Sequence, residues 1–409
     1  MEGHGTPYEL RSLETPTTQP QRDSTPRVSA FDRFIARKIL EFRGNPPTPL
    51  RLWDGSEVGR SVETPVARLR IEDRRTLLRL ATQGDLGFGD AYSEGKIEID
   101  GDLVQTLTTL FSVEEPDTWT TRLLGRRRRP KMRKHTLGGA RESIHHHYDL
   151  GNDFYALWLD AAMVYTCAYF PTPTASLEEA QEAKLELVCR KLGLEAGERV
   201  LDVGCGWGSF VIQAASRHGA RAVGITLSEE QARLARERAR EAGVADLVEF
   251  RVADYREVSD GPFDAIASIG MVEHVGEEQI DVYARRLWSL LRPGGRLLNH
   301  GIAKLKDFDT PDEGAFSERF VFPDGVPLPL SRVLRALERT DLTTTHVEGL
   351  QNDYATTIGY WIDRFDARWD DAVRLAGIER ARIWRLYLRA ARQGFETGWA
   401  SVYQVLAHR

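Results

Sequence analysis

A short stretch of the sequence combines the residue types that a ligand-binding turn requires. Residues 199–208 read Arg-Val-Leu-Asp-Val-Gly-Cys-Gly-Trp-Gly. The apolar run that ends in Asp202 is typical of a buried parallel strand, and the segment 209–218 is typical of a helix. Between them lie three glycines, which leave no side chain between the backbone and a ligand: Gly204, Gly206 and Gly208. A strand, a glycine turn and a helix in this order favour ligand binding at the carboxyl end of the strand.

The spacing of these glycines differs from the Gly-x-Gly-x-x-Gly of dinucleotide-binding proteins. It resembles motif I of the class I methyltransferases. That resemblance implies that the loop, together with Asp202, holds the amino-acid end of S-adenosylmethionine. The alternative is a tight turn in some other α/β protein, so the elements around the loop have to distinguish the two interpretations.

The elements around the loop alternate between strand and helix from residue 141 onward. Strands are expected at 199–203, 221–226, 247–252, 263–269 and 295–302, and helices at 208–218, 228–242 and 277–291. This alternation predicts a mostly parallel sheet covered on both faces, with ligands at the carboxyl ends of its strands. The class I methyltransferase resemblance implies a Rossmann-like sheet of seven strands.

Polar residues follow the next two expected strands. Class I methyltransferases usually place an acidic residue after the second strand to bind the ribose hydroxyls. Here Thr226 stands in that place with Gln231 one helical turn on, and a hydroxyl and an amide can bond the same diol. The alternative is a helix start capped by Ser228, and both interpretations can hold. After the third strand, Asp254 is placed to accept from the adenine amino group and Tyr255 to flank the ring.

Composition limits the class of protein. A chain of 409 residues suggests two or three domains, and its net charge of −6 gives no reason to expect nucleic-acid binding. Three cysteines make no disulfide framework, which fits a reducing cytoplasm. No apolar run approaches the roughly 20 residues that span a bilayer. A protein of this kind that works on lipids would visit a membrane surface without crossing it.

We expect four segments along the chain. Residues 1–27 are a polar tail expected to be disordered, and 28–113 form a small α+β domain. In that domain, 28–42 is a basic amphipathic helix that either packs on its own domain or lies on a membrane. Short strands are expected within 48–75, and helical patterning within 76–113 is broken by Gly84, Gly87 and Gly89.

The third segment, 114–140, is a basic linker with seven cations between Arg126 and Lys134. It is either solvated or in contact with anionic lipid headgroups. The catalytic domain is then 141–409. It starts near three adjacent histidines, His145 to His147, whose side chains point apart, so that no metal site is expected.

Several motifs in order narrow the class. The chain resembles the cyclopropane-fatty-acyl-phospholipid synthases and the related mycolic acid methyltransferases across about residues 140–409. The match rests on His147-Tyr-Asp-Leu-Gly-Asn-Asp153, Tyr165-Thr-Cys-Ala-Tyr169, Leu201 to Gly208, Met271-Val-Glu-His-Val-Gly276, Phe320-Val-Phe-Pro-Asp-Gly325 and Asp353-Tyr-Ala-Thr-Thr357. A weaker match around Gly87 to Tyr92 favours the phospholipid branch, because the mycolic acid enzymes lack the N-terminal domain.

The resemblance implies a reaction and its residues. An alkene in an acyl chain attacks the sulfonium methyl group, and a bound bicarbonate ion removes a proton from the resulting carbocation so that a cyclopropane ring closes. The implied cofactor contacts include Tyr165 and Thr166. The implied bicarbonate ligands are Cys167, Glu273, His300, Ile302 (by its backbone) and Tyr354. All of these except Ile302 are also the expected catalytic residues. The alternative for Glu273 and His300 is a pair of satisfied polar groups at strand ends.

Three other outcomes stay open from the sequence. After a hydride shift the same cation can lose a proton and leave a methylene branch for a reductase partner, in which case Glu142 could supply an extra carboxylate. A small-molecule N-methyltransferase and an inactive lipid-binding protein are the remaining alternatives. The preferred interpretation is a cytoplasmic, peripherally membrane-associated enzyme acting on unsaturated phospholipid acyl chains. A homo-oligomer is left open.

Overall fold

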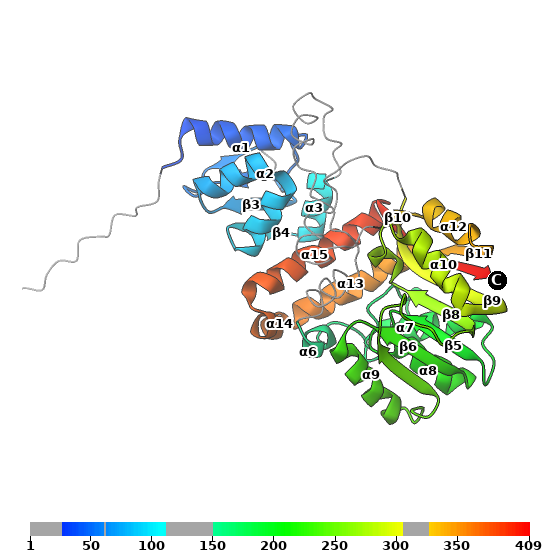
Figure 1. The fold of residues 1–409 in the computed structure, drawn as a ribbon. Helices are drawn as coiled ribbons and strands as arrows, with labels where there is room; N and C mark the ends of the chain where they lie inside the picture. Colours follow the sequence, from blue (N-terminus) through cyan, green and yellow to red (C-terminus); the bar gives the residue numbers. More distant parts are fainter. Residues whose placement is uncertain (1–26, 61–62, 112–149, 306–326) are drawn as a thin grey trace, which may run out of the picture.

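The computed structural model describes residues 27–60, 63–111, 150–305 and 327–409 (Figure 1). Several sequence expectations fall outside these ranges and stay predictions. They concern the tail 1–26, the linker 114–140 with its cations, the three adjacent histidines, Glu142, and the stretch from Phe320 to Gly325.

The N-terminal domain combines helices with a small sheet, as expected. Its strands pair in the order β2-β1-β3-β4. Its elements are α1 (Ala30–Phe42), β1 (Leu50–Arg51), β2 (Glu57–Val58), β3 (Ala67–Ile71), α2 (Arg74–Ser93), β4 (Ile97–Gly101) and α3 (Leu103–Phe111).

Two details of this domain differ from the sequence expectation. Only Gly84 breaks the helical patterning, where a φ of 54° kinks α2. Gly87 lies within the helix. A Cβ at this position would come within 2.7 Å of the Arg79 carbonyl oxygen, so only glycine fits beside the kink. The strand β4 was missed, since its alternation is short and lies between two helices.

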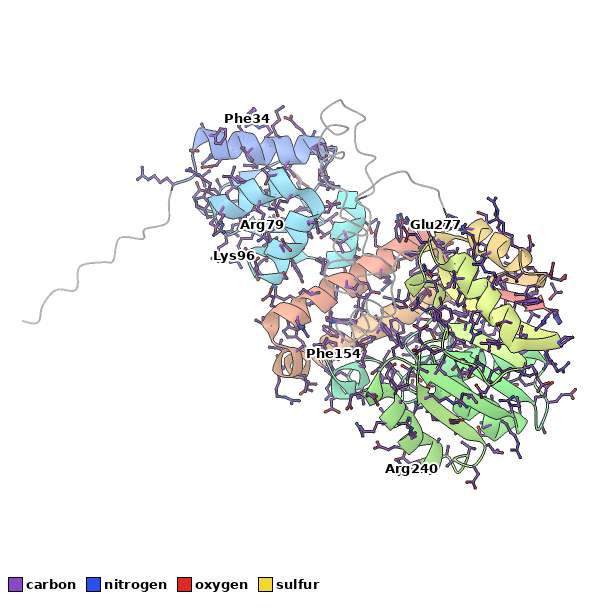
Figure 2. The ribbon with its side chains drawn as sticks, in the orientation of Figure 1. Phe34, Arg79, Lys96, Phe154, Arg240 and Glu277 are labelled. Atoms are coloured by element: carbon purple, nitrogen blue, oxygen red, sulfur yellow. The ribbon has the colours of Figure 1, made fainter. Side chains whose placement is uncertain are left out.

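Helix α1 packs on this domain by one face only. Asp32, Ala36 and Leu40 are buried at a spacing of four residues, and the Asp32 carboxylate pairs with Arg74 of α2. The opposite face carries exposed aromatic side chains, including Phe34, which lies on the outer side of the helix (Figure 2).

The catalytic domain contains an eight-stranded, mostly parallel sheet. Seven strands follow the order β11-β12-β9-β8-β5-β6-β7, as the class I fold implies, and the short β10 pairs with β9 in addition. Only the pairings of β12 with β9 and β11 are antiparallel. The strands are β5 (Arg199–Val203), β6 (Arg221–Thr226), β7 (Val248–Val252), β8 (Phe263–Ile269), β9 (Leu291–Lys304), β10 (Leu328–Pro329), β11 (Thr343–Gly349) and β12 (Ala400–His408).

Helices cover both faces of the sheet and a further helical layer. One face packs against α7 (Leu177–Leu192), α8 (Ser209–His218) and α9 (Glu229–Glu241), and the other against α10 (Ile280–Leu290) and α12 (Leu330–Glu338). The further layer comprises α6 (Asn152–Ala156), α13 (Gln351–Ala367), α14 (Trp369–Ala376) and α15 (Ile378–Glu396), and the 3₁₀ turn η1 covers Val272–His274. Because this layer packs on residues 154–168 and on the end of β9, it closes one side of the strand ends where ligands are expected.

Helix α15 also joins the two domains, running between them in Figure 1. Leu386 is part of the N-terminal core, and Arg382 donates hydrogen bonds to the carbonyl oxygens of Tyr92 and Ile97. Across the described residues, no helix is both long enough and apolar enough to cross a bilayer.

Candidate active site

A pocket opens at the carboxyl ends of β5 to β8, where the sequence places the cofactor. Six of the expected cofactor residues line it: Gly204, Gly206, Thr226, Gln231, Asp254 and Tyr255. Met271 and His274 from the turn after β8 also line it. Residues from four separate strand ends therefore meet in one cavity.

The glycine loop presents backbone to this pocket. Gly204 and Gly206 have φ angles of 83° and 52°, a region that favours glycine. The amides of Gly204 and Cys205 both donate to the Ile225 carbonyl oxygen, at 3.0 and 2.9 Å, which fixes the loop to β6. A Cβ on Gly204 would lie 3.1 Å from the Met271 side chain, so the narrow space suits a ligand that approaches bare backbone.

Gly208 has a different role from its neighbours. It stands at the N-cap of α8 with a φ of 82° and does not line the pocket. A Cβ there would come within 2.7 Å of the Phe250 ring and 3.0 Å of Ala235. This glycine therefore allows close packing of α8 on β7 and α9, and its expected contact with the cofactor is not supported by its position.

Thr226 and Gln231, the two residues expected at the ribose, are hydrogen-bonded to each other. The Thr226 hydroxyl donates to the Gln231 side-chain oxygen at 2.7 Å. This leaves the Gln231 amide nitrogen as the donor of the pair. Ser228 also caps α9 by accepting from the Gln231 backbone amide at 3.3 Å, so the capping interpretation holds at the same time.

Asp254 and Tyr255 are less free than the sequence suggested. The Asp254 carboxylate is buried and accepts two hydrogen bonds from the Arg256 guanidinium, each 2.7 Å long. The Tyr255 ring packs edge-on against Tyr283 in the core, with ring centroids 5.6 Å apart. Both line the pocket, but a ligand amino group would share the Asp254 carboxylate with Arg256.

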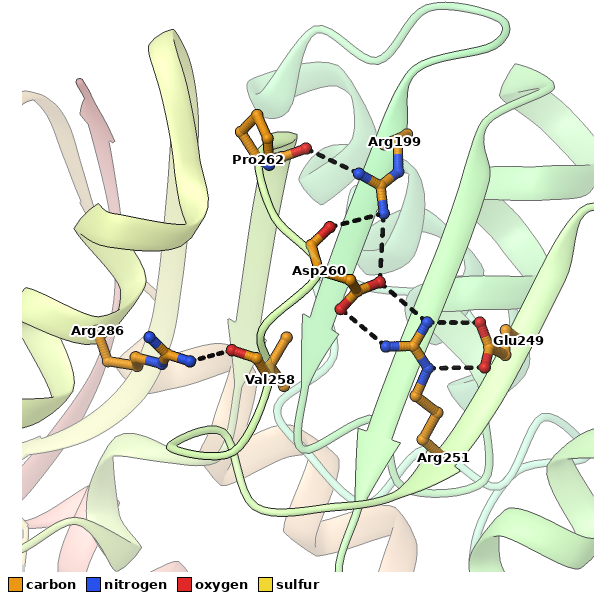
Figure 3. A network of polar contacts seen from close by, with 7 residues as sticks. All are labelled: Arg199, Glu249, Arg251, Val258, Asp260, Pro262 and Arg286. Carbon is orange, nitrogen blue, oxygen red and sulfur yellow. Dashed lines mark hydrogen bonds and ion pairs between the residues drawn. The ribbon is translucent and has the colours of Figure 1, made fainter.

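A polar network holds the loop that carries these two residues (Figure 3). Asp260 accepts from Arg199 of β5 and from Arg251 of β7, at 3.3 and 2.9 Å. Arg286 of α10 donates to the carbonyl oxygens of Tyr255 and Val258. The loop is therefore tied to two strands and one helix.

Asp202 and Thr166 lie behind the pocket, around a buried lysine that the sequence analysis missed. The Lys184 ammonium donates to the Thr166 hydroxyl at 2.9 Å, and burial lowers the pKa of Lys184 to about 8. Burial raises the pKa of Asp202 to about 7, while the positive charge of Lys184 opposes that rise. Asp202 Oδ1 has no hydrogen-bond partner. Two buried titratable groups, Asp202 and Lys184, therefore lie close to the residues that precede the glycine loop and to Thr166.

Polar residues on the apolar face of α7 were the signal that could have revealed Lys184. Gln181 and Lys184 stand three residues apart, on the helix face that also buries Leu185 and Val188. Gln181 donates to the Thr166 carbonyl oxygen at 2.9 Å. Polar residues on an otherwise apolar face indicate buried partners, and here the partner is the segment with Tyr165 and Thr166. A Cβ on Gly270, which lines the pocket, would lie 2.7 Å from Thr166 Cγ2.

A second group of expected residues gathers around the end of β9. The Ile302 amide donates to Glu273 Oε1 at 2.6 Å, and a Cβ on the neighbouring Gly301 would clash with Val272 Cγ1, so this glycine allows the turn with Glu273 to pack on β9. Glu273 Oε2 is buried and has no hydrogen-bond partner. Burial raises the pKa of Glu273 to about 7, although the bond from Ile302 opposes that rise.

His300 lies two residues before Ile302 and is 2 % exposed. Its Nδ1 lies 3.1 Å from the Gln404 side-chain nitrogen. Burial, with the positive charges of Lys184 and Lys191, lowers the pKa of His300 well below its usual value. The imidazole is therefore neutral at neutral pH.

Cys167 and Tyr354 approach the same strand end from the helical layer. The Cys167 thiol donates to the Ala168 carbonyl oxygen at 3.1 Å, and burial raises its pKa well above the usual value, so it is no thiolate. The Tyr354 ring packs against Phe395, with centroids 4.6 Å apart. Both residues belong to the apolar cluster that Ile302 contacts.

The implied anion fits this group with one change to its ligand set. The Ile302 amide is already used by Glu273, so it is not a free donor. The unpartnered Glu273 Oε2 and the neutral His300 remain as polar groups for a small ion. The turn η1 connects the cofactor pocket with the residues around the end of β9. It carries Glu273, and its neighbour His274 lines the pocket.

This site is that of an S-adenosylmethionine-dependent methyltransferase of the class I fold. Residues 135–405 match the family described as mycolic acid cyclopropane synthetase, and the chain belongs to that family. Residues 35–117 match a second family, described as a domain of unknown function.

Three similar proteins cover most of the chain. A probable fatty acid methyltransferase of Pseudomonas putida is 37% identical over 88% of this chain and 91% of its own length. The tuberculostearic acid methyltransferase of Mycobacterium tuberculosis is 34% identical over 97% of both chains. The cyclopropane-fatty-acyl-phospholipid synthase of Escherichia coli is 33% identical over 84% of this chain and 88% of its own length.

A solved structure gives the same family. The mycolic acid cyclopropane synthase CmaA1 in complex with SAH and CTAB has a TM-score of 0.63 and 31% identity. It covers 66% of this chain and 98% of its own. The expected fold class and the use of S-adenosylmethionine are thereby confirmed, and similar proteins are named as fatty acid methyltransferases or cyclopropane synthases.

Proposed function

We propose that this protein transfers a methylene group from S-adenosylmethionine to the cis double bond of an unsaturated phospholipid acyl chain, forming a cyclopropane ring. The observation that carries the proposal is the buried Glu273, whose Oε2 has no hydrogen-bond partner and which stands in the chain between the pocket-lining Met271 and His274. The similarity to a cyclopropane-fatty-acyl-phospholipid synthase supports the substrate.

In this proposal S-adenosylmethionine would supply the electrophilic methyl group, and bicarbonate would supply the base. The protein's own contribution is to hold charge and exclude water. Because Glu273 Oε1 accepts from Ile302, a proton on this carboxyl resides on Oε2. A neighbouring anion raises the pKa of Glu273 further, so that Oε2 donates to the anion instead of repelling it.

Aromatic rings suit the cation that the reaction forms. Tyr165, Trp158 and Trp361 pack together with centroids 5.2 to 5.5 Å apart, in the cluster that also holds Cys167 and Tyr354. Their π faces stabilise positive charge without providing a nucleophile that would trap it. The thiol of Cys167, kept protonated by burial, is equally unreactive.

A branch-forming outcome is the second candidate, favoured by the similarity to the tuberculostearic acid methyltransferase. It shares the methyl transfer and differs in a hydride shift that moves the positive charge to the carbon bearing the new methyl group before the proton is lost, so the same site serves both. The branch-forming outcome would require a reductase partner to saturate the methylene group.

The deciding experiment is mass spectrometry with gas chromatography of fatty acids from cells that express the protein and receive methyl-labelled methionine. A gain of one methylene group, about 14 mass units plus the mass of its label, that resists mild hydrogenation supports the cyclopropane proposal. The same gain with a hydrogenatable methylene overturns the ring and supports the branch. Absence of labelled lipid overturns both and favours a small-molecule methyltransferase.

We also propose that the enzyme reaches its lipid at the cytoplasmic surface of a membrane through the outer face of α1. Phe31 and Phe34 are 60% and 51% exposed, and Phe42 and Lys38 continue the same stripe at a spacing of four residues. This stripe lies opposite the buried face, so it is not needed to fold the domain. Exposed aromatics beside a cation match the boundary between acyl chains and anionic headgroups.

Sedimentation with vesicles of dioleoylphosphatidylglycerol and dioleoylphosphatidylcholine tests the helix. The double variant Phe31→Ser/Phe34→Ser should bind about tenfold more weakly, because two partly inserted rings lose their apolar burial. The matched control is Ile378→Ser on α15, which removes an apolar side chain that is 54% exposed elsewhere. Equal binding by the double variant and the control would overturn the proposed docking face.

Replacement of the cations between Arg126 and Lys134 tests the linker separately. If the linker contacts headgroups, vesicle binding weakens in a salt-dependent way. Unchanged binding would leave these residues as a simple connection between domains.

A further inference from the structure

A row of polar side chains crosses three strands next to the reaction side of the site. Glu348 of β11 pairs in register with Gln404 of β12, and Gln404 pairs with His300 of β9. Lys191, from the last turn of α7, lies over this row and donates to Glu348 and, at 2.7 Å, to the Gln404 side-chain oxygen. Gln404 is fully buried, so its amide has no solvent to exchange partners with.

The chemistry of lysine fixes the direction of the Gln404 amide. An ammonium group only donates, so the amide atom that faces Lys191 is the oxygen. The amide nitrogen therefore faces His300 Nδ1, 3.1 Å away. That nitrogen also only donates, so Nδ1 must accept with its lone pair. A neutral imidazole whose Nδ1 accepts carries its single proton on Nε2.

We infer that Gln404, oriented by Lys191, is a positioning residue that locks His300 in the Nε2–H tautomer, so that His300 serves the site as a fixed neutral hydrogen-bond donor. The description of His300 as a donor to the reaction rests on the proposed function, whereas the tautomer does not.

The surrounding charges support the same state. Two ammonium groups, those of Lys184 and Lys191, oppose a positive imidazolium, and burial opposes it as well. His300 is therefore unsuited to carrying a proton through the cycle. A neutral N–H donor instead stabilises a small anion without adding a charge that would compete with the reaction's cation.

The tautomer can be measured directly by long-range ¹H–¹⁵N correlation spectra of the full chain labelled with ¹⁵N-histidine. Loss of one signal in His300→Gln assigns the ring. We expect Nδ1 of the wild type to show the shift of a bare nitrogen and Nε2 that of a protonated one. A proton on Nδ1 in the wild type would overturn the inference, whatever the enzyme's substrate.

The variant Gln404→Glu should reverse the direction of the hydrogen bond at His300 Nδ1. A carboxylate at this position accepts a hydrogen bond, so we expect the His300 proton to move to Nδ1 or the ring to become doubly protonated. The kcat for labelled methyl transfer should fall about 100-fold while the KM for S-adenosylmethionine stays within twofold. Gln393→Glu, which makes the same charge change on α15, is the matched control and should keep the wild-type tautomer and kcat.

Gln404→Met keeps the inference testable if the glutamate variant does not fold. This side chain has similar length but no hydrogen-bonding amide, so we expect a mixture of both tautomers. A pure Nε2–H signal in a folded Gln404→Met or Gln404→Glu protein would overturn the role of Gln404. A wild type that is locked as Nε2–H but modifies no lipid would refute the proposed function while the positioning role stands.

Discussion

The two sides of the active site are built in different ways. The cofactor side is formed by strand ends and loops within about 80 residues of the chain, from Val203 to Gln279, and much of it is backbone. The reaction side brings together residues far apart in sequence: the Cys167 thiol faces the Leu350 carbonyl oxygen, 183 positions away. The first is a pocket at the strand ends, and the second is buried among aromatic rings.

This difference separates binding from chemistry. In the cofactor pocket, lining residues such as Thr226 and Gln231 keep an ordinary hydrogen bond to each other. On the reaction side, burial shifts the pKa of Glu273, His300 and Cys167, each toward its neutral form. Neutral groups in a dry site can stabilise a transient cation and a small anion together without neutralising either. Variants on the two sides should therefore fail in different kinetic constants.

The largest effect is expected from Glu273→Gln. Removing the group that can hold a proton beside the anion should lower kcat by about 100-fold or more. The dissociation constant of S-adenosylhomocysteine, measured by calorimetry, should change less than twofold because the cofactor side is intact. Glu277→Gln is the matched control, since that carboxylate is exposed and pairs with Arg332. Normal turnover of Glu273→Gln would remove the proposed anion site.

The sequence predicted the cofactor side better than the reaction side for a physical reason. The glycine loop and the residues that follow β6 and β7 are local patterns, and six of them do line one pocket. Gly208 shows the limit of such patterns, because only the packing of Phe250 reveals its structural role. The residues of the reaction side were named through the family resemblance. Lys184 is marked locally only by its place on an apolar helix face, and nothing local marks Gln404 as the partner of His300.

The arrangement of strands was also only partly accessible from sequence. The parallel strands β5 to β8 were predicted closely. Strands β5, β6 and β8 are mostly apolar and buried, and in β7 Glu249 and Arg251 alternate with apolar residues. The start of β9 at Leu291 was missed, since Pro293 and two glycines interrupt its pattern. Register across β9, β12 and β11 depends on contacts more than 50 residues apart, which no local pattern encodes.

A smaller effect is expected on the pH dependence of the free energy of unfolding, through the buried Glu273 of the reaction side. The folded protein keeps the Glu273 proton up to about pH 7, whereas the unfolded chain loses it near its ordinary pKa of 4.5. This group's contribution to stability is therefore complete at low pH and is lost as the pH rises through 7. Glutamine at this position is neutral throughout. The free energy of unfolding of Glu273→Gln, relative to that of the wild type, should therefore rise by about 2 kcal/mol between pH 5.5 and pH 8.

Urea denaturation of the cofactor-free proteins at both pH values measures this gain. Glu277→Gln should show no comparable change, because its carboxylate is exposed in the folded protein. A difference between Glu273→Gln and the wild type that stays constant with pH would mean that Glu273 ionises in the folded state as it does in the unfolded chain.

The smallest effect is expected on the cofactor side, from Gln231→Leu. The loss of one hydrogen-bonding amide should raise the dissociation constant of S-adenosylmethionine about tenfold, because a single such bond contributes about 1 to 1.5 kcal/mol. At saturating cofactor the kcat should match the wild type, which is the reverse of the expected behaviour of Glu273→Gln. If Gln231→Leu instead lowers kcat with unchanged affinity, then Thr226 and Gln231 do not hold the ribose, and the division between a binding side and a reaction side would be wrong at its best-defined point.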